Sequence, residues 1–415
     1  MIIQPILGLI VFLGIAYAMS ENRQKIPYKM VFMGIMIQFF IGIVLLKLPL
    51  FNEFFLALNK VIIALEESTK AGTSFVFGFL GGGVLPFDEK FPGSSYILAF
   101  RALPLILLIS ALSSLLFYWK ILPYVVKGFS IALEKSLSIG GAEGLGISAN
   151  IFVGMVESPL LIRPYLKSMT RSELFSLMVC GMATIAGTVM ILYASILDRV
   201  IENVLGHILI ASIMSAPAAI IIAKTMVPET SSNQTSGDIS LEETNSSMDA
   251  LTKGTIQGVD LLINITAMLI TMVAIIHLIN IFLGVFPNVL GEALTLQRVL
   301  GVCMAPIVWL MGIPWDEVIT AGSLLGTKTV LNELIAYIHM ANLNPDALSA
   351  NSLIIMTYGL CGFANPGSLG IMIGGMGTMA PTRRAEIVSL GGKSIIAGTL
   401  ATCMTGSIAG LLIGV

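Results

Sequence analysis

Long apolar runs alternate with short polar segments along this chain. Several runs reach ~20 residues, the length at which an α-helix crosses a bilayer, whereas a membrane barrel would show short alternating segments. The predicted spans cover Ile3–Met19, Met30–Leu48, Tyr96–Trp119, Leu174–Leu197, Val204–Thr225, Leu261–Phe286, Asn351–Met379 and Ser394–Ile413. The pattern therefore predicts an all-α polytopic membrane protein with eight transmembrane helices.

Two of these spans are interrupted by small and polar residues. The span at 174–197 contains Gly181, Thr184 and Gly187, and the span at 351–379 is broken at Cys361-Gly-Phe-Ala-Asn365-Pro-Gly367. Non-helical backbone at membrane depth is tolerated only where protein or a water-filled cavity satisfies it. Each break is therefore expected to offer free N–H and C=O groups to a solute.

Three other segments do not resemble simple spans. Phe51–Glu67 has apolar residues on one helical face and charges on the other, which predicts an interfacial helix or a helix packed on a partner subunit. The glycine-interrupted stretch 120–166 predicts a re-entrant hairpin. A second hairpin is expected from arms at Val299–Gly312 and Val318–Ala341, joined around Pro314-Trp315-Asp316.

The order of these segments divides the chain into four parts. Residues 1–70 would hold scaffold helices and the interfacial helix, and 71–227 a first transport repeat of span, hairpin, broken span and span. Residues 228–253 would form a mobile cytoplasmic loop, because this polar stretch cannot bury a core. Residues 254–415 repeat the order of the first transport repeat, and such inverted repeats are typical of transporters.

Composition supports a membrane protein. Of the 415 residues, 56% are hydrophobic and 11% charged, with a mean hydropathy of +0.93. Soluble domains carry roughly 25% charged residues, so this chain cannot cover a water-facing surface. The net charge of −2 gives no reason to expect nucleic acid as a partner. The start of the chain lacks a basic region typical of a cleavable signal peptide.

Basic residues set the expected orientation. With eight spans and two hairpins, the basic residues between spans fall on one side, which is cytoplasmic by the positive-inside rule. They are Arg23, Lys25, Lys29, Lys120, Lys127, Arg163, Lys167, Arg171, Arg383, Arg384 and Lys393. Both termini are then expected outside.

Each hairpin carries one acidic residue within an apolar segment, Glu157 in the first and Glu333 in the second. An ionisable group at membrane depth is costly and usually marks a cavity, a partner or a translocation path. Carboxylates, amides and hydroxyls can hydrogen-bond a polar solute that is neutral or cationic, and two acids disfavour an anion. The residues therefore predict a polar solute site near the membrane midplane.

Several motifs resemble those of the concentrative nucleoside transporter family. The first is Asn150-Ile-Phe-Val-Gly-Met-Val-Glu157-Ser-Pro-Leu-Leu-Ile-Arg163-Pro, which resembles the family's first-hairpin signature. The others are Thr329-Val-Leu-Asn-Glu333-Leu, Cys361-Gly-Phe-Ala-Asn365 and Ala380-Pro-Thr-Arg-Arg384, which resemble its second-half motifs. They occur in order, and the resemblance covers nearly the whole chain.

The resemblance implies a homotrimer in the lipid of a bacterial inner membrane. It implies cation-coupled symport that imports nucleosides through an elevator-like movement of the transport repeats. No cofactor is implied, and the coupling ion would be sodium.

The resemblance also implies two sets of site residues. Nucleoside binding would involve Met155, Val156 and Glu157 at the base, Glu333, Asn365 and Ser368 towards the ribose, Phe363 packed nearby, and Asn332. Sodium would be held by the Asn150 side chain, the Val153 carbonyl, Thr184 and the Ile185 carbonyl. Oxygen ligands of this kind suit a hard cation.

One departure from the family pattern leaves the substrate open. The family usually has Gln and then Thr or Ser before the first-hairpin acid, where this chain has Met155 and Val156. Two side-chain partners for the base are therefore absent, so the purine or pyrimidine preference is open. Thr184 replaces the usual Ser and keeps the hydroxyl. Proton coupling through Glu157 or Glu333 is the alternative to sodium.

Two other functions are compatible with paired acids in a membrane. One is a membrane-embedded enzyme that uses them as an acid–base pair. The sequence has no nucleophile-elbow, HExxH or phosphate-loop motif that would support chemistry of this kind. The other is a non-transporting, gate-like protein built on similar hairpins.

Overall fold

A computed structural model describes residues 3–47, 49–88, 95–155, 157–231, 245–288 and 293–413. Within these ranges every regular element is a helix, so the predicted all-α fold is confirmed. The first helices are α1 (Ile3–Ala18), α2 (Tyr28–Lys47), α3 (Pro49–Phe77), α4 (Leu98–Arg101) and α5 (Leu105–Tyr118).

The rest of the chain shows the same order of helices twice. The first set is α6 (Ile121–Leu137), α7 (Gly141–Asn150), α8 (Glu157–Leu161), α9 (Arg171–Ala183), α10 (Gly187–Leu197) and α11 (Val204–Met226). After α12 (Ser247–Leu283), the second set is α13 (Leu296–Leu310), α14 (Val318–Val330), α15 (Glu333–Ala341), α16 (Ala350–Leu360), α17 (Pro366–Met379) and α18 (Arg384–Ile413). This repetition agrees with the predicted pair of repeats.

The helix lengths account for the predicted spans. Six helical segments among the described residues are long and apolar enough to cross a membrane: Tyr28–Lys47, Leu98–Tyr118, Arg171–Leu197, Val204–Met226, Ser247–Leu283 and Pro381–Ile413. Three shorter apolar helices accompany them, Ile3–Ala18, Leu296–Leu310 and Ala350–Leu360, and the count of eight spans remains a prediction.

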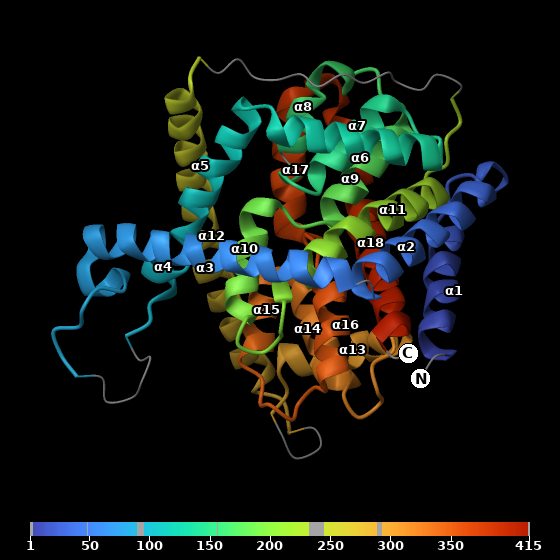
Figure 1. The fold of residues 1–415 in the computed structure, drawn as a ribbon. Coiled ribbons are helices and arrows are strands. Elements are labelled where there is room, and N and C mark those ends of the chain that lie inside the picture. Colours follow the sequence, from blue (N-terminus) through green and yellow to red (C-terminus); the bar gives the residue numbers. More distant parts are fainter. Residues whose placement is uncertain are drawn as a thin grey trace.

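Two helices extend beyond their predicted limits. α3 continues to Phe77, past the expected boundary at residue 70. It runs roughly perpendicular to long helices such as α12 and α17 (Figure 1). α12 begins at Ser247, inside the expected loop and well before the predicted span. The central part of that loop, 232–244, lies outside the described residues. The division into four parts remains a prediction.

The second hairpin differs from the prediction in one respect. α13 and α14 do pack together and are joined around Pro314, but the expected arm 318–341 is not continuous. It breaks at Leu331, and Asn332 starts a new helix by accepting a hydrogen bond from the Ile335 N–H. The break places Glu333 in the first turn of α15, as Glu157 is in α8.

Side-chain caps define several other helix starts. Thr170 and Glu173 form a reciprocal capping box at α9. Ser349 caps α16 and Asn365 caps α17, which has Pro366 at its first position. Polar side chains thus fix the starts of α9, α15, α16 and α17, whereas α10 begins after Ala186 without a side-chain cap.

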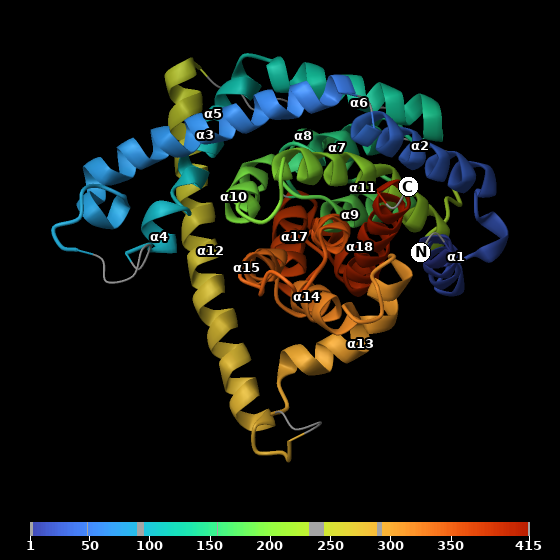
Figure 2. The ribbon, with the colours of Figure 1, turned by 60° about the horizontal axis from the view of Figure 1, so that its bottom comes forward.

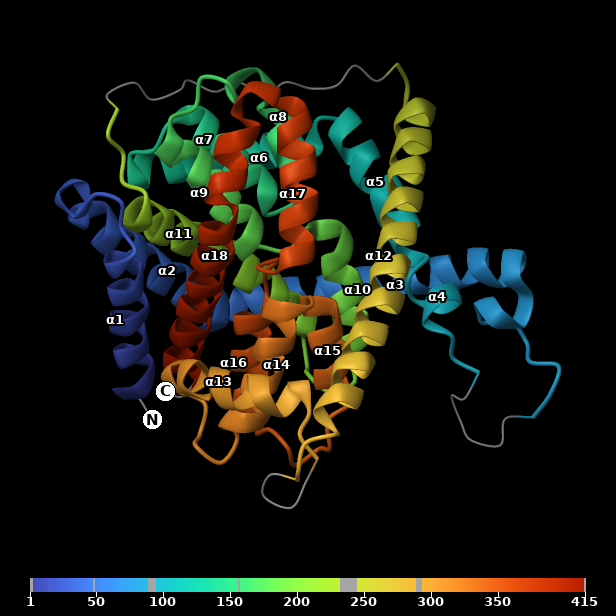
Figure 3. The ribbon, with the colours of Figure 1, turned by 180° about the vertical axis from the view of Figure 1, so that it is seen from behind.

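The two repeats surround a common core. The broken helix α9–α10 and the helices α11 and α18 are largely buried, whereas α12 is exposed along most of its length. Figure 2 shows α3 and α12 on the outside with α9 and α18 in the interior. The tip-forming helices α7 and α8 lie near one end of the molecule, and α14 and α15 lie toward the end that holds both termini (Figures 1 and 3).

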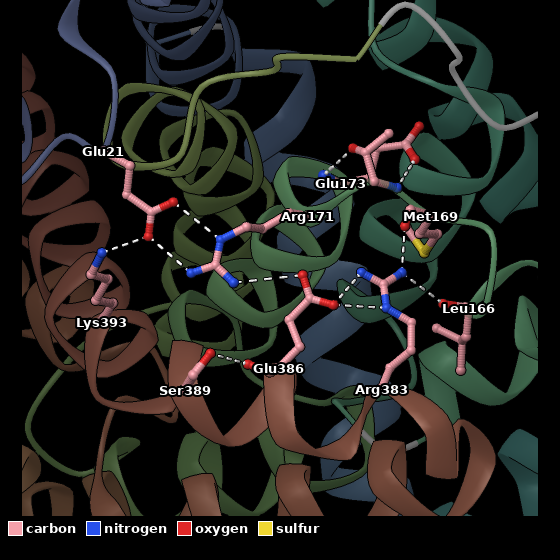
Figure 4. Close-up of polar contacts among 10 residues, drawn as sticks. Glu21, Leu166, Met169, Arg171, Glu173, Arg383, Glu386, Ser389 and Lys393 are labelled. Carbon is pink, nitrogen blue, oxygen red and sulfur yellow. Dashed lines mark hydrogen bonds and ion pairs between the residues drawn. The ribbon is translucent and has the colours of Figure 1, made fainter.

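A cluster of charges joins three segments at the end away from the termini (Figure 4). Glu21, in the loop between α1 and α2, lies 2.9 Å from Arg171 of α9 and 2.6 Å from Lys393 of α18. Glu386 of α18 lies 3.6 Å from Arg171 and 2.6 Å from Arg383. The Arg383 guanidinium also donates to the carbonyls of Leu166 and Met169.

Candidate functional site

A cavity of about 390 Å³ lies where both hairpin tips, both broken helices and α12 meet. Its lining includes the two acids, Glu157 and Glu333, although they are far apart in sequence. The other predicted site residues on its wall are Val153, Met155, Asn332, Phe363, Asn365 and Ser368. The cavity therefore brings together residues from both repeats.

Glu333 is held in one orientation by two donors. Its Oε1 accepts a 2.7 Å hydrogen bond from the Tyr193 hydroxyl, and its Oε2 accepts a 3.1 Å bond from Asn365 Nδ2. The residue is only 4% exposed. A buried carboxylate needs such partners, so the site is built to keep this group in place.

Asn365 connects this acid to the break between α16 and α17. Its Nδ2 donates to Glu333, and its Oδ1 accepts a 2.8 Å hydrogen bond from the Ser368 N–H. The same side chain therefore starts α17 and orients Glu333. Phe363, two residues earlier, is half-buried and supplies an aromatic surface to the cavity wall.

Glu157 begins α8 and is exposed to the cavity. The turn before it depends on Gly154, whose φ of +120° is a conformation that side chains strain. A Cβ on Gly154 would also lie 2.8 Å from Glu157 Oε2 and 2.9 Å from the Ala186 Cβ. Met155 is nearly buried beside this turn, and Val156 lies outside the described residues.

Polar residues that sequence reasoning did not identify complete the wall. α12 contributes Gln257, Asp260 and Asn264, and α10 contributes Thr188 and Tyr193. The three α12 residues fall at positions i, i+3 and i+7, which places them on one helical face. That spacing was visible in the sequence, but the predicted span began at Leu261 and so left Gln257 and Asp260 outside it.

The residues expected to hold sodium come from the first hairpin and from the break between α9 and α10, and one of them, Val153, lines the cavity. Asn150 is the last residue of α7 and is 2% exposed. Its Nδ2 would lie 3.3 Å from a Cβ added to Gly181 of α9. Thr184 ends α9, and its hydroxyl donates a 2.9 Å hydrogen bond to the Cys180 carbonyl, so its oxygen can still act as a ligand. The Ile185 carbonyl accepts a long 3.5 Å contact from Ser212.

This donor set fits a hard cation. It offers an amide oxygen, a hydroxyl and the backbone carbonyls of Val153 and Ile185, which lie in non-helical segments. Unwound carbonyls at a broken helix commonly take this role in transporters. Val153 also lines the cavity, so the two sets of residues share the first hairpin tip.

Sequence comparisons give a consistent result along the chain. Residues 7–80 match the family model for the Na⁺ dependent nucleoside transporter N-terminus, and 207–410 match that for its C-terminus. Residues 99–200 match a model named Gate, described as nucleoside recognition.

Similar proteins include nucleoside permease NupC of Helicobacter pylori, 35% identical over 99% of this chain and 97% of the permease. An uncharacterized transporter of Haemophilus influenzae is 38% identical over 100% of this chain and 98% of its own length. Human solute carrier family 28 member 3 is 34% identical over 98% of this chain and 59% of its own length.

Solved structures of CNTnw share this fold. An inward-facing, substrate-bound structure has a TM-score of 0.91 at 35% identity, covering 100% of this chain and 98% of that chain. A variant in an outward-facing state gives a TM-score of 0.92 at 35% identity with the same coverage.

Proposed function

The chain belongs to the concentrative nucleoside transporter family, and from this premise we propose that it imports nucleosides by symport with sodium. Membership makes it an integral membrane transport protein, and it excludes the alternative of an enzyme that uses paired acids. The substrate, the coupling ion and the movement are expected from the family resemblance, and the residues around the cavity support the first two.

The observation that carries the proposal is the cavity wall shared by both repeats. Glu333 is fixed by Tyr193 and Asn365 and can accept hydrogen bonds from the hydroxyls of a ribose. A site built around such acceptors rejects analogues that lack the hydroxyls, because its own groups would be left unpaired. Ser368 and Asn332 also line the cavity.

The nucleobase would face the first hairpin tip. Glu157 provides an acceptor there, while Met155 provides an apolar surface and Phe363 an aromatic one. Gln257, Asp260 and Asn264 of α12 add donors and acceptors to the cavity lining. These α12 residues can compensate for the base contacts expected to be absent at positions 155 and 156.

Sodium would supply a positive charge that holds the first tip against the broken helix. Asn150 and Val153 belong to that tip, and Thr184 and Ile185 belong to the α9–α10 break. Met155 and Glu157 follow within the same turn. An ordered tip would therefore present the base-facing residues correctly, which links ion binding to nucleoside binding.

We further propose a homotrimer in the bacterial inner membrane with both termini outside. The repeats would move as a unit against scaffold helices in an elevator-like manner. The exposed apolar surfaces of α2 and α12 are suited to lipid or a second subunit. CNTnw has been solved in inward-facing, outward-facing and intermediate states.

Uptake of labelled uridine into proteoliposomes tests the proposal. A sodium gradient should drive accumulation, and a proton gradient alone should not. Glu333→Gln should weaken uridine binding at least tenfold, since a hydrogen bond to a charged group contributes about 1.5–3 kcal/mol. Asp316→Asn, at an exposed residue away from the cavity, serves as the control.

The possible failures are distinguishable. Accumulation driven only by protons would overturn the sodium assignment and leave nucleoside import intact. No accumulation of any nucleoside under either gradient would overturn import itself. Unchanged uridine binding by Glu333→Gln would show that this carboxylate does not face the substrate.

A further inference from the structure

Lys328 is a charged residue that nucleoside and sodium binding leave unexplained. It lies in α14, five residues before Glu333, and its side chain is fully buried. A lysine ammonium in such surroundings requires partners, because the loss of hydration is costly. The contacts of this ammonium therefore indicate what it does.

The partners of Lys328 are uncharged oxygens. Nζ donates to the Gly359 carbonyl at 3.0 Å and to Thr402 Oγ1 at 2.8 Å. Thr402 in turn donates to the Thr399 carbonyl at 3.0 Å, so its hydroxyl presents a lone pair to the ammonium. Over the described part of the chain, no carboxylate lies within 4 Å of Lys328 Nζ.

The Gly359 carbonyl belongs to the last turn of α16. Carbonyls at a helix end lack helical partners and carry the negative end of the helix dipole, which favours a cation there. α16 ends at Leu360, where the chain breaks before α17. The ammonium thus neutralises the end of a broken helix within the protein core.

The first repeat has an equivalent helix end. α9 and α16 begin at 171 and 350, and α10 and α17 at 187 and 366, so these two second-repeat helices start 179 residues after their counterparts. By that offset Gly359 corresponds to Cys180, whose carbonyl accepts the hydrogen bond from Thr184. The ammonium therefore stands at the counterpart of the helix end where sodium binding is proposed.

The second repeat lacks the side-chain ligands of the first. By the same offset, the counterpart of Thr184 is Phe363, which has no side-chain oxygen. The short helices α8 and α15 both begin with a glutamate, at 157 and 333, so the hairpin tips are offset by 176 residues. This second offset pairs Asn150 with Gly326. An amide and a hydroxyl are thus replaced by a glycine and a phenylalanine, and a lysine is present instead.

We propose that Lys328 is a built-in cation that takes, in the second repeat, the place that the coupling ion takes in the first. Its ammonium ties α14 to the end of α16 and to α18, and so positions the second tip with Glu333 beside Asn365. The second break then needs no metal ion, and sodium dependence arises from the first repeat alone. The comparison with a coupling ion rests on the proposed function.

Thermal unfolding of the purified full-length protein tests the built-in cation. Lys328→Ala removes the ammonium and leaves a space next to the Gly359 carbonyl and Thr402. Ethylammonium should raise the melting temperature of this variant towards wild type, while ethanol, which has the same number of heavy atoms and no charge, should not. Lys328→Met fills the space without a charge and should melt below wild type with no response to ethylammonium. Lys253→Ala, at a partly exposed lysine that pairs with Asp249 at the start of α12, controls for loss of a positive charge.

Sodium titrations of the melting temperature and of uridine binding complete the test. Wild type should respond to sodium as a single site, and Lys328→Ala should recover uridine affinity with ethylammonium present. Failure of ethylammonium to act on Lys328→Ala, or wild-type melting and uridine affinity in Lys328→Met, overturns the proposal. If Lys328→Ala does not fold, Lys328→Met decides alone: wild-type melting and uridine affinity in that variant overturn the proposal.

Amine rescue is independent of which ion drives uptake. If transport proves to be proton-driven, rescue of Lys328→Ala still establishes a structural ammonium, and only its comparison with sodium is lost. If rescue fails while sodium drives uridine uptake, the proposed function stands and the role of Lys328 is wrong. The two proposals can therefore fail separately.

Discussion

At the scale of single residues, the hydroxyl of Tyr193 is the contact whose removal is most informative. It donates the 2.7 Å hydrogen bond to Glu333 Oε1, while Asn365 holds the other oxygen. Tyr193→Phe should leave a poorly oriented carboxylate in the cavity. We expect nucleoside affinity, measured by calorimetry on purified protein, to fall on the order of 10- to 100-fold, because a hydrogen bond to a charged group contributes about 1.5–3 kcal/mol.

Tyr337→Phe is the matched control for Tyr193→Phe. Tyr337 is a buried neighbour whose ring centroid lies 5.3 Å from that of Tyr193, and its hydroxyl donates to the Thr357 carbonyl rather than to Glu333. Its loss should lower stability with little effect on affinity. Equal losses of affinity in the two variants would contradict a specific role for Tyr193.

The site residues that could be predicted carry a local signal. Glu333 is an acid in an apolar run, and Asn365 precedes a proline in a broken span, so each can be recognised without a structure. Tyr193 carries no such signal, because its partner is 140 residues away and a tyrosine in a span is ordinary. Asp260 did carry a signal, the polar spacing on α12, and the prediction placed the start of that span too late.

At the scale of helices, the contact between α5 and α12 depends on two glycines of α12 four residues apart. A Cβ on Gly254 would lie 2.6 Å from the Ser110 carbonyl oxygen, and one on Gly258 would lie 3.0 Å from the Leu107 Cα. Small residues at this spacing allow two membrane helices to approach closely. Gly254→Ala should therefore push the pair apart and lower the melting temperature of the purified protein.

Gly128→Ala provides a control with the opposite sign. Gly128 lies in α6, is exposed and has no atom within 4 Å of an added Cβ. Alanine there should stabilise the helix by about 0.5–1 kcal/mol, since glycine is the less favourable residue in a helix interior. A stabilising effect at both positions would show that α5 and α12 are not held by close contact.

The helices themselves were largely predictable because apolar length decides whether a segment can span a membrane. Their internal breaks were predicted where glycine, threonine or proline interrupts an apolar run, as at Thr184 and Pro366. The break at Leu331 was not predicted, because it lies within an otherwise apolar helical pattern. There the cap formed by Asn332 overrides the pattern, and the structure is needed to reveal it.

At the scale of the molecule, the repeats explain why two distant acids meet. Each repeat places its acid at the start of a short helix, and the tips approach a shared cavity from α8 and α15. The sequence could predict this meeting because the same order of segments occurs twice. It could not predict that α12 lines the cavity, since α12 lies outside the repeated sets.

The charge cluster of Figure 4 gives the molecule a pH-dependent link between its N-terminal loop and the ends of α9 and α18. Hydrogen bonds from Arg171, and then from Lys393, hold the pKa of Glu21 at about 2, although partial burial opposes this shift. A pKa lowered on folding means that Glu21 stabilises the folded protein above its ordinary value of 4.5, and that this stability is lost as the pH falls towards 2.

Glu21→Gln should therefore lower the free energy of unfolding near pH 7 and have a shrinking effect as the pH falls below 4.5. The carboxylate is 30% exposed, so water and salt screen the cluster and the loss should be about 1 kcal/mol or less. Melting temperatures of the detergent-solubilised protein between pH 7 and 3 would measure this loss, with Asp346→Asn at an exposed loop acid as control.

High salt should also reduce the difference at pH 7, because screening weakens ion pairs at a protein surface. A difference between Glu21→Gln and wild type that stays constant from pH 7 to pH 3 would mean that Glu21 acts through packing rather than through its charge.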